Sequence, residues 1–409
     1  MRREKTRDLS RRVRHTSDPT SSNPPNSDPT NSNPTNSDPT SGDPTSGNPT
    51  NSLADLVAHK RVIVACGTGG VGKTTMAAAT AVAAAQRGRR AVVVTIDPAK
   101  RLADALGIDR LGNTPTEIDG VWPGTVGAMM LDTKATFDDV VTRHANSSAQ
   151  IEQIFGNRFY VNVSTELPGT QDYMAVEKLN ELHFSGEWDL VVVDTPPTRD
   201  ALAFFEAPKL LTRLLDNTIY KLLISPRPGV LRAVNRAAGG VVRRLSRVVG
   251  AEVVDDAIEF FQTFQGMEEG FKQRADETLA LLASDDTVFV LVASPRNDTI
   301  SEALYFLNRL ADANLSVHAV VINRILAAMS TSAVEAAQLH ARLSDGPLAG
   351  AAQVLLDHVN AAAGDEDRIA QLMAHVPDAA LTTVPLMPSD VHDIPMLSQI
   401  AELLANSPR

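Results

Sequence analysis

Short apolar runs alternate with stretches of mixed apolar and polar residues along the chain from Leu53 onward. Several of these runs are almost continuous in Val, Ile and Leu, which is typical of strands that are covered on both faces. We predict strands at Val62–Cys66, Ala91–Ile96, Val126–Leu131, Leu190–Val193, Val288–Ala293, Val317–Ile322 and Leu381–Val384. Helical patterns separate most of them, so the sequence predicts an α/β fold with a doubly wound, mainly parallel sheet.

The stretch from about residue 201 to residue 282 has no strand pattern and is longer than a simple crossover. Its apolar residues recur at helical spacing. We predict three helices there, at Leu210–Ile224, Val230–Val249 and Asp255–Leu282. We therefore expect one α/β domain at residues 53–409, with a helical subdomain inserted at about residues 201–282 and a second helical excursion at residues 330–375.

Residues 1–52 differ in composition from the rest of the chain. Arginines crowd the first fifteen residues, and prolines then recur every five residues among Ser, Thr, Asn, Asp and Gly. Because such a segment has almost no apolar surface to bury, we predict a disordered tail. Two alternatives stay open: that its arginines contact an acidic surface or anionic lipid, and that translation starts further along the chain.

Overall composition narrows the class of protein. The net charge of −11 argues against a nucleic-acid binder that relies on overall positive charge, so we expect no nucleic-acid partner. A single cysteine excludes a disulfide framework within the chain and favours the cytoplasm. No apolar run is long enough to span a membrane, and no secretory apolar segment follows the basic N-terminus.

The segment Gly67–Thr75 fits the phosphate-binding pattern G-x-x-x-x-G-K-[ST] in full. A buried strand, Arg61–Cys66, precedes it, and an alanine-rich helical pattern, Met76–Ala85, follows it. This order places a phosphate group at a helix N-terminus. We expect a P-loop NTPase whose phosphate-binding residues are Gly67, Gly69, Gly70, Val71, Gly72, Lys73, Thr74 and Thr75. Lys73 would reach the β- and γ-phosphates, and the Thr74 hydroxyl would bind Mg²⁺.

Three further predicted strands end in polar residues, at the sheet edge where ligands bind. Asp97 follows a strand that we expect next to the P-loop strand, and it would orient or deprotonate the attacking water. Asp194 would bind Mg²⁺ or one of its waters. Asn323 would pair with adenine, which is favoured because the Asn-Lys-x-Asp segment of guanine readers is missing. Each could instead be an ordinary turn residue at a strand end.

Together these segments resemble the deviant Walker-A ATPases, and most closely the family of arsenite-pump and tail-anchored-protein targeting ATPases in its actinobacterial form. The similarity runs from about Arg61 to Leu404. The family's loop, switch I, switch II and Pro-Gly segments are similar to Gly67–Thr75, Asp97–Lys100, Asp194–Thr198 and Pro168–Asp172. Its adenine-side loop is similar to Val384–Leu386, so the resemblance adds Pro385 to the expected nucleotide contacts, and we add Arg324 beside Asn323.

The resemblance implies a cytoplasmic, dimeric switch that binds ATP with Mg²⁺, hydrolyses it, and passes its nucleotide state to a client or partner. Lys73 and Asp97 would be its catalytic residues. In targeting relatives two helical subdomains form an apolar groove for a membrane helix, so a hydrophobic protein client is implied. The stripe Phe260–Phe271 is the candidate client surface, unless it packs in the core as most apolar stripes do. The arginines of Val230–Val249 would contact anionic lipid at a membrane surface, unless they form an ordinary solvated face.

The chain departs from the family at the residue after Gly67, where Thr68 replaces the family's signature lysine. In the family that lysine reaches across a dimer to the partner's nucleotide, and a missing cation at a transferring phosphoryl group costs ~10³-fold or more in rate. Three explanations stay open. Another cation such as Lys100 replaces the lysine, the chain is slow on its own, or a related lysine-bearing ATPase completes a heterodimer.

Cysteine content separates the chain from two branches of the family. With Cys66 alone, it has neither the zinc clasp of the eukaryotic targeting members nor the metalloid-binding cysteines of the arsenite pumps, so we do not expect arsenite as the ligand. It has one P-loop where the pump has two, so a composite site would need two chains. A partitioning or positioning ATPase of the same superfamily is a further alternative, although those proteins are usually shorter.

Overall fold

The computed structural model describes residues 52–97, 100–166, 169–196, 206–210, 212–213, 215–217 and 251–406. Apart from Ser52, the predicted tail lies outside these ranges, as do the predicted helix Val230–Val249 and residues 197–198 of the switch II segment. The first described helix, α1 (Leu53–His59), begins after Ser52, whose hydroxyl accepts a hydrogen bond from the Asp55 N–H. The division into a tail, a main domain and an inserted subdomain stays a prediction.

The described strands form one sheet of eight, in the order β3-β4-β2-β5-β1-β6-β7-β8. Their bounds are β1 Val62–Gly67, β2 Arg90–Thr95, β3 Thr116–Ile118, β4 Thr125–Met130, β5 Leu190–Asp194, β6 Thr287–Ala293, β7 Val317–Ile325 and β8 Ala380–Pro385. Every neighbouring pair is parallel except β3 and β4. The predicted doubly wound, mainly parallel sheet is therefore confirmed, and all the predicted strands are present. The sequence pattern misses β3, because three residues are too few to show a period.

The position of β2 differs from the expectation. β2 pairs with β4 and β5, and β5 lies between β2 and the P-loop strand β1. Asp194, the last residue of β5, is in register with Ala65 of β1 and with Thr95 of β2. Because these three strands are parallel, their carboxyl ends still meet at one edge of the sheet, and Asp97 follows β2 there.

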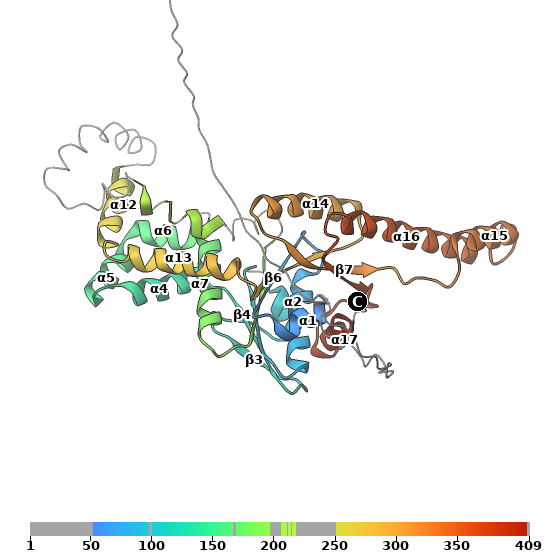
Figure 1. Ribbon diagram of the computed structural model, residues 1–409, viewed down its shortest axis with the longest axis horizontal. Coiled ribbons are helices and arrows are strands. Elements are labelled where there is room, and N and C mark those ends of the chain that lie inside the picture. Colours follow the sequence, from blue (N-terminus) through green and yellow to red (C-terminus); the bar gives the residue numbers. More distant parts are fainter. Residues whose placement is uncertain are drawn as a thin grey trace, which may run out of the picture. The chain divides into compact units, whose positions relative to one another are not determined.

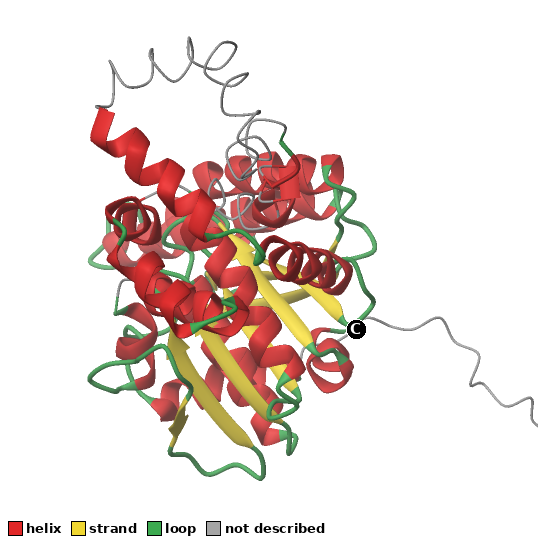
Figure 2. Cartoon of the chain, turned by 90° about the vertical axis from the view of Figure 1, so that its left-hand side faces the viewer, coloured by secondary structure: helices red, strands yellow, loops and turns green. Residues whose placement is uncertain are grey.

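Each face of the sheet is covered by its own layer of helices (Figure 2). Ile63 and Ala65 of β1 pack on the side of α1, α2 (Lys73–Gln86) and α17 (Ile394–Ala405), whereas Val62 and Val64 belong to the apolar cluster of the other face. This alternation is what a strand covered on both faces requires. Small side chains let the alanine-rich α2 lie close to the strands, and most of its residues are buried.

The other face is extended by a group of helices that contact one another (Figure 1). They are α4 (Thr133–His144), α5 (Ser148–Gly156), α6 (Arg158–Glu166), α7 (Thr170–Phe184), α12 (Ala251–Thr263) and α13 (Glu268–Leu282). The prediction of one helix at Asp255–Leu282 is wrong, because the chain turns between α12 and α13 at Gly266, which has a φ of +91°. Of the helix predicted at Leu210–Ile224, the described residues 210, 212–213 and 215–216 are helical, and residue 217 is not.

The phenylalanine stripe of α12 and α13 lies inside this helical group. Phe260, Phe264 and Phe271 are buried, and their rings contact one another and those of Tyr160 in α6 and Tyr173 in α7. Of the two outcomes left open for this stripe, the structure shows packing in the core and not a client surface. Helical spacing cannot separate the two outcomes, because an apolar face packs equally well on a helix of the same chain.

α7 connects the helical group to the edge of the sheet. Near its start, the Gln171 side chain donates a hydrogen bond of 2.7 Å to the carbonyl of Ile96, directly after β2. Further along, the buried carboxylate of Glu177 accepts hydrogen bonds from Arg143 of α4 and Arg274 of α13. A single helix thus contacts both the ligand-binding edge and two helices of the outer group.

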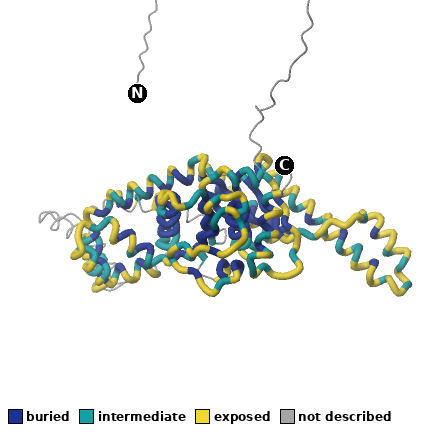
Figure 3. The backbone as a smooth tube through the Cα atoms, turned by 90° about the horizontal axis from the view of Figure 1, so that it is seen from below, coloured by how far each residue is buried: buried dark blue, intermediate teal, exposed yellow. Residues whose placement is uncertain are grey.

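The predicted second helical excursion is confirmed. α15 (Ala333–Leu343) and α16 (Ala349–Met373) form a hairpin between β7 and β8, and α16 contacts α14 (Asn297–Asp312). Figure 3 shows that buried residues concentrate in the sheet and the helices next to it, whereas the hairpin is largely exposed. Within the described part of the chain, no helix is long and apolar enough to cross a membrane.

Candidate functional site

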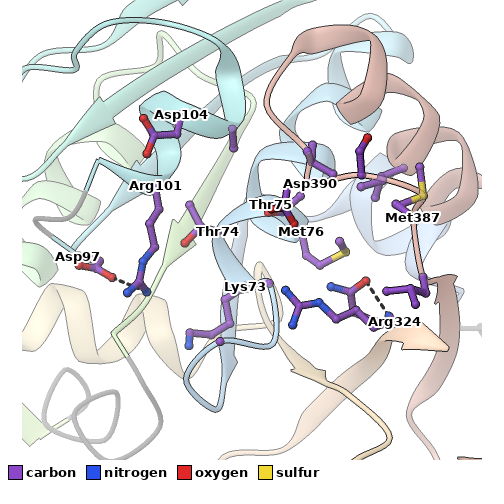
Figure 4. Close-up of a pocket in the computed structure, with 18 of the residues that line it drawn as sticks. Lys73, Thr74, Thr75, Met76, Asp97, Arg101, Asp104, Arg324, Met387 and Asp390 are labelled. Carbon is purple, nitrogen blue, oxygen red and sulfur yellow. Dashed lines mark hydrogen bonds and ion pairs between the residues drawn. The ribbon is translucent and has the colours of Figure 1, made fainter.

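The carboxyl edge of the sheet contains a cavity of about 450 Å³ (Figure 4). Its wall is formed by the loop after β1 and the start of α2, by α3 (Arg101–Leu106), by the end of β7 and by the segment after β8. The predicted site residues on this wall are Gly70, Gly72, Lys73, Thr74, Thr75, Asp97, Asn323 and Arg324. Segments far apart in the sequence therefore meet where a parallel sheet of this kind binds its ligand.

Two glycines of the loop are required by their surroundings. A Cβ at Gly67 would overlap the backbone carbonyl of Val292 in β6, and a Cβ at Gly72 would lie 2.5 Å from the side-chain nitrogen of Asn323. Both glycines have a positive φ, +150° and +94°, where side chains are largely excluded. α2 begins after Gly72 without a side-chain cap, which leaves its first N–H groups available to an anion.

Lys73 is a buried cation at this helix start. It is 7 % exposed, and its Nζ donates a hydrogen bond of 2.8 Å to the carbonyl of Thr68. Burial lowers the pKa of Lys73, and the charge of Asp194 opposes that shift. Thr68 is itself buried, and its hydroxyl has no hydrogen-bond partner among the described residues. The loop therefore presents one lysine to a ligand. At the position of the family's signature lysine, this chain has the short, buried side chain of Thr68.

Asp194 lies directly behind the start of α2. Its Oδ2 accepts hydrogen bonds from Thr74 Oγ1 at 2.8 Å and from Thr95 Oγ1 at 2.9 Å, whereas its Oδ1 has no partner among the described residues. Burial raises the pKa of Asp194 from 3.8 to about 6, although both hydrogen bonds and Lys73 act against the shift. A hydroxyl beside a carboxylate with an unpartnered oxygen suits Mg²⁺, which prefers oxygen ligands and keeps several waters. The two predicted metal residues therefore lie together.

Asp97 forms an ion pair with Arg101, in which Oδ2 and Nη1 are 3.2 Å apart. The Asp97 side chain is 21 % exposed and that of Arg101 is 62 % exposed. In Figure 4 the Arg101 side chain extends from α3 into the cavity towards Asp97, on the same side as Thr74. Lys100, the cation that the sequence suggested as a replacement for the missing lysine, lines a different cavity. Sequence reasoning missed Arg101, although it directly follows the switch I segment.

Asn323 holds the loop in place. Its Nδ2 donates a hydrogen bond of 2.8 Å to the carbonyl of Val71, and its Oδ1 accepts one of 2.9 Å from the Arg324 N–H. The predicted pairing with adenine would use the second hydrogen and the second lone pair that the amide retains. Arg324 has a φ of +64°, an uncommon value for a residue with a side chain, where the register between β7 and β8 shifts.

The remaining predicted residues are not on the cavity wall. Pro385 ends β8 and is not on the wall, whereas its neighbours Leu386 and Met387 are. The loop residues away from the wall are Gly67, Gly69 and Val71. Asp104 and Asp390 also line the cavity, and no motif in the sequence pointed to them.

Comparison with known proteins identifies relatives of this chain. A family model described as anion-transporting ATPase matches residues 60–345. The chain is 30 % identical over 267 residues to the uncharacterized protein SCO2128 of Streptomyces coelicolor, and this match covers 65 % of the chain and 63 % of that protein. It is 25 % identical over 280 residues to the ATPase get3 of Aspergillus terreus, which covers 67 % of the chain and 76 % of that protein.

A further match, 25 % identical over 276 residues, is to a protein of Chlorobaculum tepidum whose assignment as an arsenical pump-driving ATPase is provisional. It covers 66 % of this chain and 63 % of the relative. The family model begins just before β1 and ends just after α15, so it includes the loop, Asp97, Asp194 and Asn323. The chain therefore belongs to the anion-transporting ATPase family, the family of the arsenite-pump and targeting ATPases.

Proposed function

We propose that this protein binds ATP with Mg²⁺ and hydrolyses it, and that its nucleotide state controls association with a partner or a second copy. The observation that carries the proposal is the arrangement of Lys73, Thr74 and Asp194 at the start of α2. An uncapped helix N-terminus, a buried lysine and a hydroxyl–carboxylate pair are the groups that bind a nucleotide's phosphates and their metal ion. Membership in a family of ATPases supports the same activity.

Each residue has one role in this proposal. The loop N–H groups and Lys73 hold the β- and γ-phosphates, whose oxygens replace the Thr68 carbonyl as the acceptor for Nζ. Thr74 ligates Mg²⁺ and Asp194 holds one of its waters, and the bound ion supplies charge neutralisation at the phosphate oxygens. Asp97 orients the attacking water.

The adenine base of the nucleotide would lie on the opposite side of β1 from Asp97. In the sheet order, β5 and β2 lie on one side of β1, and β6, β7 and β8 lie on the other. Asn323, Arg324 and the segment after β8 line the cavity on the β7 side. An adenine there would leave the phosphates at the loop and the terminal phosphate near Asp97.

Two substitutions test the proposal. Lys73→Ala removes the phosphate-binding cation, so calorimetry with Mg²⁺ should detect ATP and ADP binding to the parent chain and none to the variant. Asp97→Asn keeps the phosphate contacts but removes the carboxylate, so binding should persist while steady-state hydrolysis falls ~10²-fold or more. Lys134→Ala, on α4 and away from the cavity wall, is the control.

Each result can contradict a separate part of the proposal. A parent chain that takes up neither ATP nor ADP overturns the proposed function as a whole. Undiminished hydrolysis by the Asp97 variant overturns the role of that carboxylate and leaves nucleotide binding standing.

An ATPase that depends on a partner is the second candidate, and Thr68 favours it. The residue is 1 % exposed and carries no charge, so it cannot serve a nucleotide bound by another subunit. A related chain with lysine at that position would complete the site of this chain in a heterodimer. Hydrolysis should then be low for this chain alone and rise when such a partner is added, whereas a high rate for the purified chain alone rules the second candidate out.

A further inference from the structure

We infer that Arg101 contacts the γ-phosphate and supplies, within the same chain, the positive charge that Thr68 cannot supply. The inference rests on the proposed function, because it requires ATP in the cavity. It assigns a residue to which neither the motifs nor the resemblance pointed.

Position in the cavity selects Arg101. Of the described residues on the cavity wall, three are cationic: Lys73, Arg101 and Arg324. Lys73 belongs to the loop itself, and Arg324 lies on β7, on the proposed base side of β1. Arg101 follows β2, on the side where β5 ends in Asp194. Of the two cations outside the loop, Arg101 is therefore the one nearer in the sheet order to Asp194, which marks the side of the terminal phosphates.

Electrostatics agree with this placement. Arg101 and Lys73 both line this cavity, so their charges act on the same small region. Two like charges converge in this way where an anion of high charge is bound, and a nucleotide's terminal phosphates are such an anion.

The ion pair with Asp97 leaves Arg101 able to move. The Arg101 side chain is 62 % exposed, and exposed ion pairs are weak because water screens them. A guanidinium binds phosphate through two parallel hydrogen bonds, and a γ-phosphate carries more charge than a carboxylate. The phosphate and Asp97 therefore compete for one guanidinium, and the phosphate is the stronger competitor.

This competition couples the binding of ATP to the proposed role of Asp97, which is to orient the attacking water. When Arg101 binds the γ-phosphate, it no longer forms the ion pair with Asp97 Oδ2 that this structure shows. The water oxygen then bonds to the γ-phosphorus as the bond from that phosphorus to the β–γ bridging oxygen breaks. The electron pair of the broken bond stays on ADP, and the water's proton passes to Asp97 and then to the released phosphate.

The test compares two ligands that need no turnover. Mg·ADP lacks the γ-phosphate, and Mg·ADP with beryllium fluoride carries a group that stands for it. Arg101→Ala should leave the affinity for Mg·ADP unchanged and weaken binding of the beryllium fluoride complex about 10- to 100-fold. Arg101→Lys keeps the charge without the paired hydrogen bonds, so its affinity for the beryllium fluoride complex should lie between those of the parent and of Arg101→Ala. Hydrolysis by Arg101→Ala should fall ~10³-fold or more.

Two variants serve as comparisons. Lys100→Ala, next in sequence but in a different cavity, should bind both ligands as the parent does. Arg324→Ala should lower the affinity for both ligands by the same factor, because both carry the adenine base.

The outcomes separate this inference from the proposed function. The inference is overturned if Arg101→Ala favours the beryllium fluoride complex over Mg·ADP as strongly as the parent does. It is also overturned if the parent binds the two ligands equally. A parent chain that binds neither ligand contradicts the proposed function instead.

Discussion

Asp194→Asn should stabilise the protein when no nucleotide or metal is added. Asparagine has nearly the same size, and its carbonyl can accept the hydrogen bonds from Thr74 and Thr95 that Asp194 accepts. Its NH₂ group would take the place of the Oδ1 atom, which has no partner among the described residues. The substitution therefore removes a buried charge and keeps the contacts that position the side chain.

The magnitude follows from the pKa of Asp194, which is 3.8 ordinarily and about 6 in the folded protein. The folded protein binds the proton of this carboxyl more tightly than the unfolded chain does. The protonated carboxyl therefore stabilises the folded state fully below pH 3.8, and this stabilisation is lost as the pH rises through about 6. At about 1.4 kcal/mol for each pKa unit, the buried charge costs roughly 3 kcal/mol at pH 8 and roughly 1–2 kcal/mol at pH 5. The variant should exceed the parent in stability by these amounts.

Urea unfolding of parent and variant at pH 5 and pH 8, without nucleotide or Mg²⁺, measures the effect. Asp97→Asn is the matched control: it breaks a partly exposed ion pair and should change the free energy of unfolding by less than about 1 kcal/mol at both pH values. A variant less stable than the parent at pH 8, or a gain that does not grow between pH 5 and pH 8, refutes the reasoning. In a separate measurement, Mg²⁺ should raise the affinity of the parent for ADP and not that of Asp194→Asn.

Two further predictions concern the loop. Gly67→Ala forces a Cβ against the Val292 carbonyl as well as into an unfavourable φ, and should lower the free energy of unfolding by about 2–5 kcal/mol. Gly70→Ala, with a φ of +76° but open space around it, should lose only about 1–2 kcal/mol, and equal losses in the two variants would contradict the steric argument. Asn323→Ala removes the donor to the Val71 carbonyl and should cost about 1–3 kcal/mol while speeding hydrogen exchange in the loop, so exchange as slow as in the parent would show that the amide does not hold the loop.

The sequence predicts the sheet well because its strands are apolar on both faces and therefore stand out from their surroundings. It also predicts part of the cavity wall, since Lys73, Thr74 and Asp97 lie at strand ends or in a motif with a fixed geometry. It does not predict that β5 separates β2 from β1, because strand order depends on how crossovers pack and leaves no local mark.

Other errors have equally local causes. One helix was expected where Gly266 divides α12 from α13, because a single glycine is tolerated within a helical pattern. Arg101 carries no motif, and only the direction of α3 brings its side chain into the cavity. The burial of the phenylalanine stripe depended on the ring-bearing residues of α6 and α7, which lie about a hundred residues earlier in the chain.

The loop after β1 is fastened at two points that do not involve Lys73: Gly67 abuts the carbonyl of Val292, and the carbonyl of Val71 is held by Asn323. A loop fastened in this way has little freedom to rearrange from one stage of a reaction cycle to the next. Any large displacement during such a cycle must then arise in the segments around it, such as the one that carries Asp97 and Arg101. The phosphate-binding loop would stay in place while the segments around it rearrange.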